Sequence, residues 1–296
     1  MIGYCCINMT IDRCVNRTMR KATFQVKGLA YAGDLAFKNL DDMLHILKWN
    51  VKNNILLYRM SSDMFPWMSE YEFSDLPNYK QILEKCNEIG NYAKNNNVRL
   101  SFHPGPFNVL GSNNKNVVEK TVDELTKHAE IMDLMGLDQS HEYPINIHVS
   151  ATKPSKDVIA QQFCNNFQML PQTVKSRLTV ENDDKLAQYT PKQLYDLIYS
   201  NIGVPITFDQ FHFECGNKDT SMQEALELCL ATWSTGKALT HHSSSKRLEQ
   251  DDDKIKVTAH SDYIYNRIQT FGHDFDTDLE AKQKDKAVLD YREVFN

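Results

Sequence analysis

Histidines and carboxylates follow several short apolar runs of this chain, each at the point where a run ends. Five successive runs close in this way, on His103, His148, Glu181, Asp209 and the pair His241-His242. Imidazole and carboxylate groups without thiolates are typical ligands of Mn²⁺, Zn²⁺ or Fe²⁺ in reactive sites, rather than of structural zinc. The pattern therefore predicts a metal-dependent enzyme.

The number of these ligands exceeds what one ion needs. We expect two or three divalent ions, most simply Mn²⁺ with Zn²⁺ or Mg²⁺ as alternatives, and we expect Glu181 to bridge them. Clustered divalent ions favour phosphoester hydrolysis, because one ion activates water while others neutralise the phosphate and the leaving oxygen.

Eight strand-like runs alternate with amphipathic helical patterns, which is typical of a barrel of parallel strands. The runs are Ile2–Ile7, Ile55–Met60, Val98–His103, Ile145–Val149, Leu178–Glu181, Val204–Asp209, Lys237–His241 and Asp274–Glu280. We predict an α/β fold, a single (β/α)8 TIM-type barrel over residues 1–296, with no linker or repeat. Such barrels gather their active sites at the C-terminal ends of the strands, where the ligands would meet.

The segment Thr10–Gly33 follows the first run and is strongly basic. It holds Arg17, Arg20 and Lys21 with other cations against one acid, Asp12. As a loop on the active-site face it could bind phosphates, and we favour this interpretation over an ordinary solvated loop.

The composition limits partners and compartment. The formal net charge of −6 gives no global basic field, so a nucleic acid would need a local patch or bound cations. The seven cysteines form no disulfide framework or zinc motif, which indicates reduced thiols. Without a signal-peptide pattern or a long apolar span, we expect an intracellular monomer that uses neither a membrane nor a nucleotide cofactor.

Several short strings, in order along nearly the whole chain, point to one family. They are Gly3-Tyr4, Asn16–Thr18, Arg59–Asp63, His103–Gly105, Asn146–His148, Leu178–Asp183, Phe208–His212, His260–Tyr263 and Asp278–Lys284. With them the chain resembles the ultraviolet-damage endonucleases, ATP-independent enzymes that nick DNA on the 5′ side of photoproducts. The resemblance implies a barrel related to endonuclease IV and a cluster of manganese-like ions.

The resemblance also implies roles for individual residues. The ligands would be His103, His148, Glu181, Asp209, His212, His260 and Glu280, with His241 or His242 from the seventh strand. Glu181 would be central to catalysis, and Tyr4 and Asn8 would lie beside the attacked strand.

Three positions depart from the family pattern. Glu70 stands where the family usually has a histidine ligand, and Leu239 or Thr240 stands in place of a lysine before the seventh-strand histidine. Pro106-Phe107 replaces the Gln-Tyr pair that probes the lesion. Phe107 can still stack on bases, so we expect Tyr4, Pro106 and Phe107 to contact the lesion in double-stranded damaged DNA.

The leading hypothesis is a metal-dependent DNA repair endonuclease that cuts 5′ of cyclobutane dimers, 6-4 photoproducts and other distortions by a metal-activated hydroxide. An abasic-site endonuclease of the endonuclease IV type shares the barrel and the ions. A metal-dependent sugar isomerase would leave the basic segment without a role. A non-catalytic DNA-binding relic would not need Glu181, Asp209, His212 and Glu280.

Overall fold

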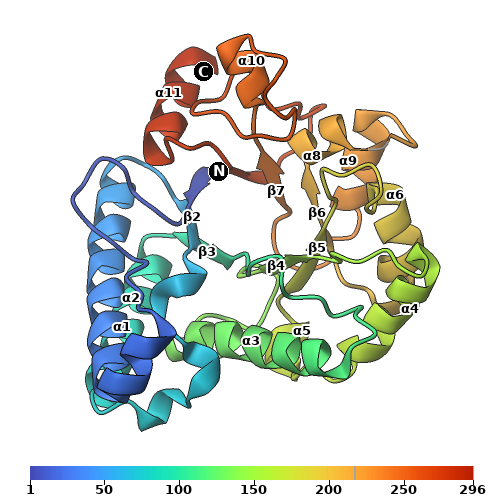
Figure 1. Cartoon of the computed structure of the whole chain (residues 1–296). Coiled ribbons are helices and arrows are strands. Elements are labelled where there is room, and N and C mark those ends of the chain that lie inside the picture. Colours follow the sequence, from blue (N-terminus) through green and yellow to red (C-terminus); the bar gives the residue numbers. More distant parts are fainter. Residues whose placement is uncertain (217, 296) are drawn as a thin grey trace.

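The structure, a computed structural model, describes residues 1–216 and 218–295 and contains a closed barrel of parallel strands (Figure 1). Each strand pairs with its neighbours in sequence order, and β8 closes onto β1. The strands are β1 Ile2–Cys5, β2 Leu57–Met60, β3 Arg99–Phe102, β4 Ile145–His148, β5 Leu178–Glu181, β6 Ile206–Asp209, β7 Leu239–His242 and β8 Asp276–Leu279. The eight strands and the barrel predicted from the sequence are confirmed.

The helices surround the barrel. The α-helices are α1 Lys21–Lys52, α2 Tyr79–Asn95, α3 Lys115–Leu134, α4 Lys156–Phe167, α5 Gln172–Lys175, α6 Pro191–Leu194, α7 Ser200–Ile202, α8 Gln210–Cys215, α9 Met222–Leu230, α10 Lys246–Gln250 and α11 Asp285–Phe295. Short 3₁₀ turns η1 Ser62–Met64, η2 Met68–Glu70 and η3 Phe73–Asp75 follow β2, and η4 Tyr195–Tyr199 is a π-helical turn.

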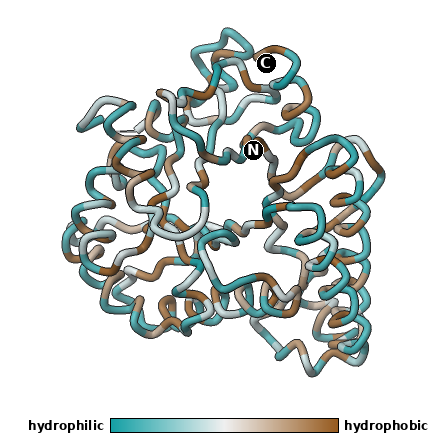
Figure 2. The backbone as a smooth tube through the Cα atoms, turned by 180° about the vertical axis from the view of Figure 1, so that it is seen from behind, coloured by the Kyte–Doolittle hydropathy of each residue, from teal (hydrophilic) through white to brown (hydrophobic). Residues whose placement is uncertain are grey.

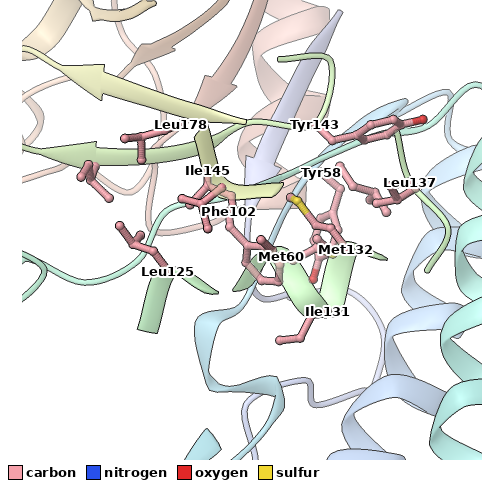
Figure 3. Packing of buried hydrophobic residues seen from close by; sticks show 14 of the residues in the cluster. Tyr58, Met60, Phe102, Leu125, Ile131, Met132, Leu137, Tyr143, Ile145 and Leu178 are labelled. Atoms are coloured by element: carbon pink, nitrogen blue, oxygen red, sulfur yellow. The ribbon is translucent and has the colours of Figure 1, made fainter. Parts of the chain in front are cut away.

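Most of the apolar core lies between the strands and these helices. Figure 3 shows Met60, Phe102 and Ile145 of β2, β3 and β4 close to Leu125 and Met132 of α3. Figure 2 shows hydrophilic and hydrophobic residues alternating along the outer helices, as expected when one face of each helix packs on the barrel.

One close approach requires a glycine. Gly90 of α2 lies so near the end of α3 that a Cβ atom there would come 1.7 Å from the carbonyl oxygen of Met135. The absence of a side chain therefore lets these two neighbouring helices pack.

The prediction that Thr10–Gly33 is a basic loop is wrong for more than half of the segment. Residues from Lys21 onward belong to α1, which has one non-helical residue at Gly28. Only the part before Lys21 is loop, because the first helix starts earlier than its mixed composition indicated. Within the described residues, no helix is both long and apolar enough to cross a membrane.

Candidate metal centre

Glu181, the last residue of β5, is the hub of the barrel mouth. Its carboxylate contacts four imidazoles: His103 Nε2 at 3.0 Å, His148 Nε2 at 3.9 Å, His212 Nδ1 at 3.1 Å and His241 Nδ1 at 3.0 Å. The register sets this meeting, since His148 lies beside Glu181 and His241 beside Asp209 on adjacent strands. Five predicted ligands thus converge at the C-terminal ends of the strands, with Asp209 joining them.

Backbone carbonyls lie beside Nδ1 of three predicted ligand histidines, one of which is His212, whose Nδ1 is 3.0 Å from the Asn182 carbonyl. His103 Nδ1 lies 3.2 Å from the Pro104 carbonyl, and His260 Nδ1 lies 2.9 Å from the Glu280 carbonyl. When Nδ1–H donates to a carbonyl, Nε2 keeps its lone pair for another partner. His103 Nε2 then faces Glu181 Oε2, and His260 Nε2 lies 3.8 Å from Glu280 Oε2.

A chain of hydrogen bonds inside the barrel fixes Glu181 from below. Thr207 Oγ1 donates to Thr179 Oγ1 over 3.1 Å, and Thr179 Oγ1 donates to Asn146 Oδ1 over 2.9 Å. The Asn146 amide in turn donates to Glu181 Oε2. All four side chains are buried, so β4, β5 and β6 together hold the carboxylate in one orientation.

The pKa values show how strongly the site favours charge. Burial alone would raise the pKa of Glu181, but His241 and His148 lower it well below its usual range. Burial opposes protonation of His212 and His241, yet Asp209 and Glu181 raise the pKa of His212 well above normal, and Glu181 raises the pKa of His241 to about 9. His148 behaves in the opposite way, because burial lowers its pKa to about 4.

The donor set fits divalent cations. At the barrel mouth, four groups of three side chains have ligand atoms within 4.8 Å of one another: His103-His241-Glu280, His103-His148-Glu181, His212-His260-Glu280 and Glu181-Asp209-His241. Glu181 Oε1, Asp209 Oδ2 and both ring nitrogens of His241 are buried, and among the described residues none of them makes a hydrogen bond of acceptable geometry, although Glu181 Oε1 and His241 Nδ1 lie close to neighbouring side chains. Buried polar atoms without partners are costly, and coordination of a cation would satisfy them. We therefore expect divalent ions here, of a kind and number that the donors alone do not set.

His241 and His242 have different environments. His241 belongs to two of the four groups, whereas His242 Nε2 lies 3.0 Å from the Asn266 carbonyl and burial lowers its pKa to about 4. The geometry places His241 in the site and directs His242 away from it.

Glu70 lies outside these groups. It ends η2, is exposed, and lines a second, neighbouring cavity of about 1160 Å³ that also reaches His103. The structure therefore does not bring Glu70 together with the other predicted ligands.

The structure buries Tyr4 and Asn8, which we expected to lie near the attacked strand. Tyr4 has no exposed surface; its hydroxyl donates to Asn50 over 2.7 Å and accepts from the Asn8 amide over 2.9 Å. The Asn8 carbonyl oxygen accepts from the backbone of Thr10 and Ile11. Both side chains organise the loop after β1, and in this structure the Tyr4 ring offers no surface on which a base could stack.

The other expected DNA contacts lie on the surface to different degrees. Phe107 is 89% exposed, and Pro106 lies beside the site in the loop after β3. Arg20 and Lys21 are exposed, while Arg17 is 2.5 Å from Asp42 and also bonds to backbone carbonyls. Phe107, Arg20 and Lys21 are therefore available to a ligand, and Arg17 is largely engaged within the protein.

Sequence reasoning missed two polar residues of the site. Arg59 of β2 donates to Glu280 Oε1 over 2.5 Å, and Asp183 Oδ2 lies 3.7 Å from His148 Nδ1. Both line the cavity of about 510 Å³ above the histidines. Both residues belong to the short strings that the chain shares with the family, and this was the one sequence feature that could have revealed them. Nothing near Arg59 in its apolar strand indicated that Glu280 is its partner.

The chain is similar to a known protein family over almost its whole length. The family described as UV-endonuclease UvdE matches residues 1–294. The chain belongs to this family. It is 30% identical over 295 residues to the UV DNA damage endonuclease of Clostridium perfringens (strain 13 / Type A), covering 97% of this chain and 69% of that protein. Membership makes the protein an endonuclease, with DNA as its substrate.

Solved structures agree on the architecture. The crystal structure of SacUVDE superposes with a TM-score of 0.87 at 27% identity, covering 99% of this chain and 96% of that one. Endonuclease IV from Thermus thermophilus gives a TM-score of 0.56 at 12% identity over 99% of this chain and 97% of that one, which shows the fold alone.

Proposed function

We propose that this endonuclease nicks damaged duplex DNA on the 5′ side of ultraviolet photoproducts, using divalent ions held by the histidine and carboxylate groups at the barrel mouth. The observation that carries the proposal is the convergence of Glu181 with four imidazoles in a chain of the UvdE family. Ions bound there would supply Lewis-acid chemistry, activating water and neutralising phosphate charge.

The ligand roles follow from the groups described above. His103, His148, Glu181, Asp209, His212, His241, His260 and Glu280 would hold two or three ions, most simply Mn²⁺. Glu181 belongs to two groups and would bridge, since its carboxylate offers two oxygens to different neighbours. Asn146 keeps those oxygens in place.

Recognition of the lesion would use the cavity beside the metal groups. That cavity is lined by Gly105, Pro106 and Phe107 as well as Glu70. Phe107 is a large apolar side chain almost wholly in solvent, and such a ring can stack where bases are unpaired. We therefore assign to Phe107, rather than to Tyr4, the role of stacking in the gap that the displaced bases leave.

The proposal is tested with purified protein, Mn²⁺ and two matched duplexes, one irradiated and one not. Nicking of the irradiated duplex alone, on the 5′ side of the photoproduct, is expected. Equal cutting of both duplexes, or of neither, would sink the lesion-specific claim.

A second duplex with one abasic site separates the neighbouring alternative. If the abasic duplex is cut faster than the irradiated one, the enzyme acts as endonuclease IV does, and the photoproduct assignment is wrong. Glu181→Gln supplies the matched control for metal-dependent cutting, because it keeps the size of the side chain and removes the charge.

A further inference from the structure

Three arginines on or beside the barrel strands are largely buried, and one differs from the others. Arg99 donates to the Glu142 and His141 carbonyls and to Asp276. Arg177 donates to carbonyls that include Leu137 and pairs with Asp133 at 2.8 Å. Each of these two guanidinium groups makes at least three hydrogen bonds within the protein, which indicates structural roles.

Arg59 has a single side-chain partner among the described residues. Its Nη1 donates to Glu280 Oε1 over 2.5 Å, although a guanidinium carries five N–H donors. Its side chain is 12% exposed, and it lines the cavity above the histidines. Most of its donors are thus uncommitted in a cavity that holds the metal-ligand groups.

The contact with Glu280 places Arg59 next to the ions' own ligand. Glu280 Oε1, which accepts from Arg59, lies 3.6 Å from His241 Nδ1, and Glu280 Oε2 lies 3.8 Å from His260 Nε2. Glu280 belongs to two of the ligand groups, so Arg59 directly contacts a member of both groups. An anion held at those groups would also be within reach of Arg59.

The charges around the cavity indicate why a buried cation at Arg59 would matter for phosphate binding. Asp183, Asp184 and Glu280 line it together with three imidazoles, and these carboxylates repel phosphate. The other basic side chain lining it, Lys185, has 69% of its surface in solvent, where screening weakens it. Arg59 is the fixed cation at depth, and its planar fork matches two phosphate oxygens.

We propose that Arg59 is a catalytic residue that binds the non-bridging oxygens of the phosphate to be cut. This deepens the proposed function and rests on it for the DNA reaction itself. Negative charge on these oxygens must be stabilised as the phosphate is attacked, and a donor already fixed by Glu280 needs little reorganisation.

The test compares wild type with Arg59→Met, Arg59→Lys and the control Arg292→Met. Arg292 donates to the carbonyls of Asn53 and Asn54, just beyond the C-terminal end of α1 and outside the site. Calorimetry measures the Kd of Mn²⁺, and then the Kd of thymidine 5′-monophosphate for the Mn²⁺-loaded protein. Nicking of irradiated duplex gives kcat and KM.

Arg59→Met is expected to bind Mn²⁺ within about threefold of wild type but to bind thymidine 5′-monophosphate roughly 10- to 100-fold more weakly, the scale of a lost charged hydrogen bond. Its kcat should fall more than its KM rises, and Arg59→Lys should recover part of both losses. Arg292→Met should match wild type.

An unchanged nucleotide Kd in Arg59→Met would overturn the assignment. So would a parallel loss of Mn²⁺, because Arg59 would then act only by arranging Glu280. If Arg59→Met does not fold by circular dichroism, Arg59→Lys decides with the same criteria. Should wild type fail to prefer irradiated DNA while Arg59→Met still weakens nucleotide binding, the lesion proposal fails and the phosphate contact stands.

Discussion

Replacing Glu181 by glutamine should remove bound metal, whereas the same change at Glu70 should not. Glu181 belongs to two of the four ligand groups at the barrel mouth, and Glu70 to none of them. An amide has the shape of the carboxylate but no charge, and it is a weaker ligand for a hard cation. Glu181→Gln should therefore lose at least one Mn²⁺ per chain.

The size of the effect follows from mass action. At a Mn²⁺ concentration about 100 times Kd, each site stabilises the folded protein by ~2.7 kcal/mol. For a chain of 296 residues, 1 kcal/mol moves the Tm by roughly 2 °C. The Mn²⁺-induced rise in Tm should thus be about 5 °C smaller in Glu181→Gln than in wild type for each site lost.

The assay combines thermal unfolding with and without Mn²⁺ and elemental analysis after equilibrium dialysis. Glu70→Gln is the matched control, since it is the same substitution on an exposed residue beside the second cavity. Full Mn²⁺ content in Glu181→Gln would refute the reasoning. An equal loss in Glu70→Gln would show that Glu70 is a ligand after all, as its place in the sequence indicated.

Three further outcomes are expected. Phe107→Ala should leave stability unchanged because the ring is 89% exposed, yet reduce the preference for irradiated over intact duplex roughly 10- to 100-fold in nicking assays. Burial lowers the pKa of His128 from 6.5 to about 4, so the unfolded chain takes up the proton first and stability is lost as pH falls through this window. Urea unfolding measures how far the free energy of unfolding decreases between pH 7 and pH 4. This decrease should be about 3 kcal/mol smaller in His128→Gln than in wild type. Gly90→Ala should destabilise by about 1–3 kcal/mol in urea at pH 7, because the new Cβ meets the Met135 carbonyl; an unchanged midpoint would contradict this close packing.

Strand ends were the part of the site that the sequence predicted well. Glu181, Asp209 and His148 end their strands, and the C-terminal ends of parallel strands meet at one face whatever the loops do. The choice between His241 and His242 was open because β7 is buried on both faces. Such strands lack the alternation of polar and apolar residues that would reveal which side chain points inward.

Long-range contacts explain the remaining errors. Arg59 bonds to Glu280, 221 residues away along the chain, and no local pattern predicts such a pair. Tyr4 looked available at a strand near the site, but its hydroxyl is bound by Asn50 of α1. Lys27, the one basic residue of that segment after Lys21, lies in the first part of α1, where the contact of Phe24 with Trp67 is a feature that local composition does not reveal.

The contacts of Glu181 also have a mechanical consequence. One carboxylate touches the side chain that directly follows β3 and side chains of β4, β7 and α8, so it links elements on different sides of the barrel mouth. Ions bound here would strengthen these links between strands, and local opening of the separate strands should become less frequent together. In hydrogen exchange, Mn²⁺ should slow the amides of β3, β4, β5 and β7 together, although more than 130 residues lie between the first and the last of them.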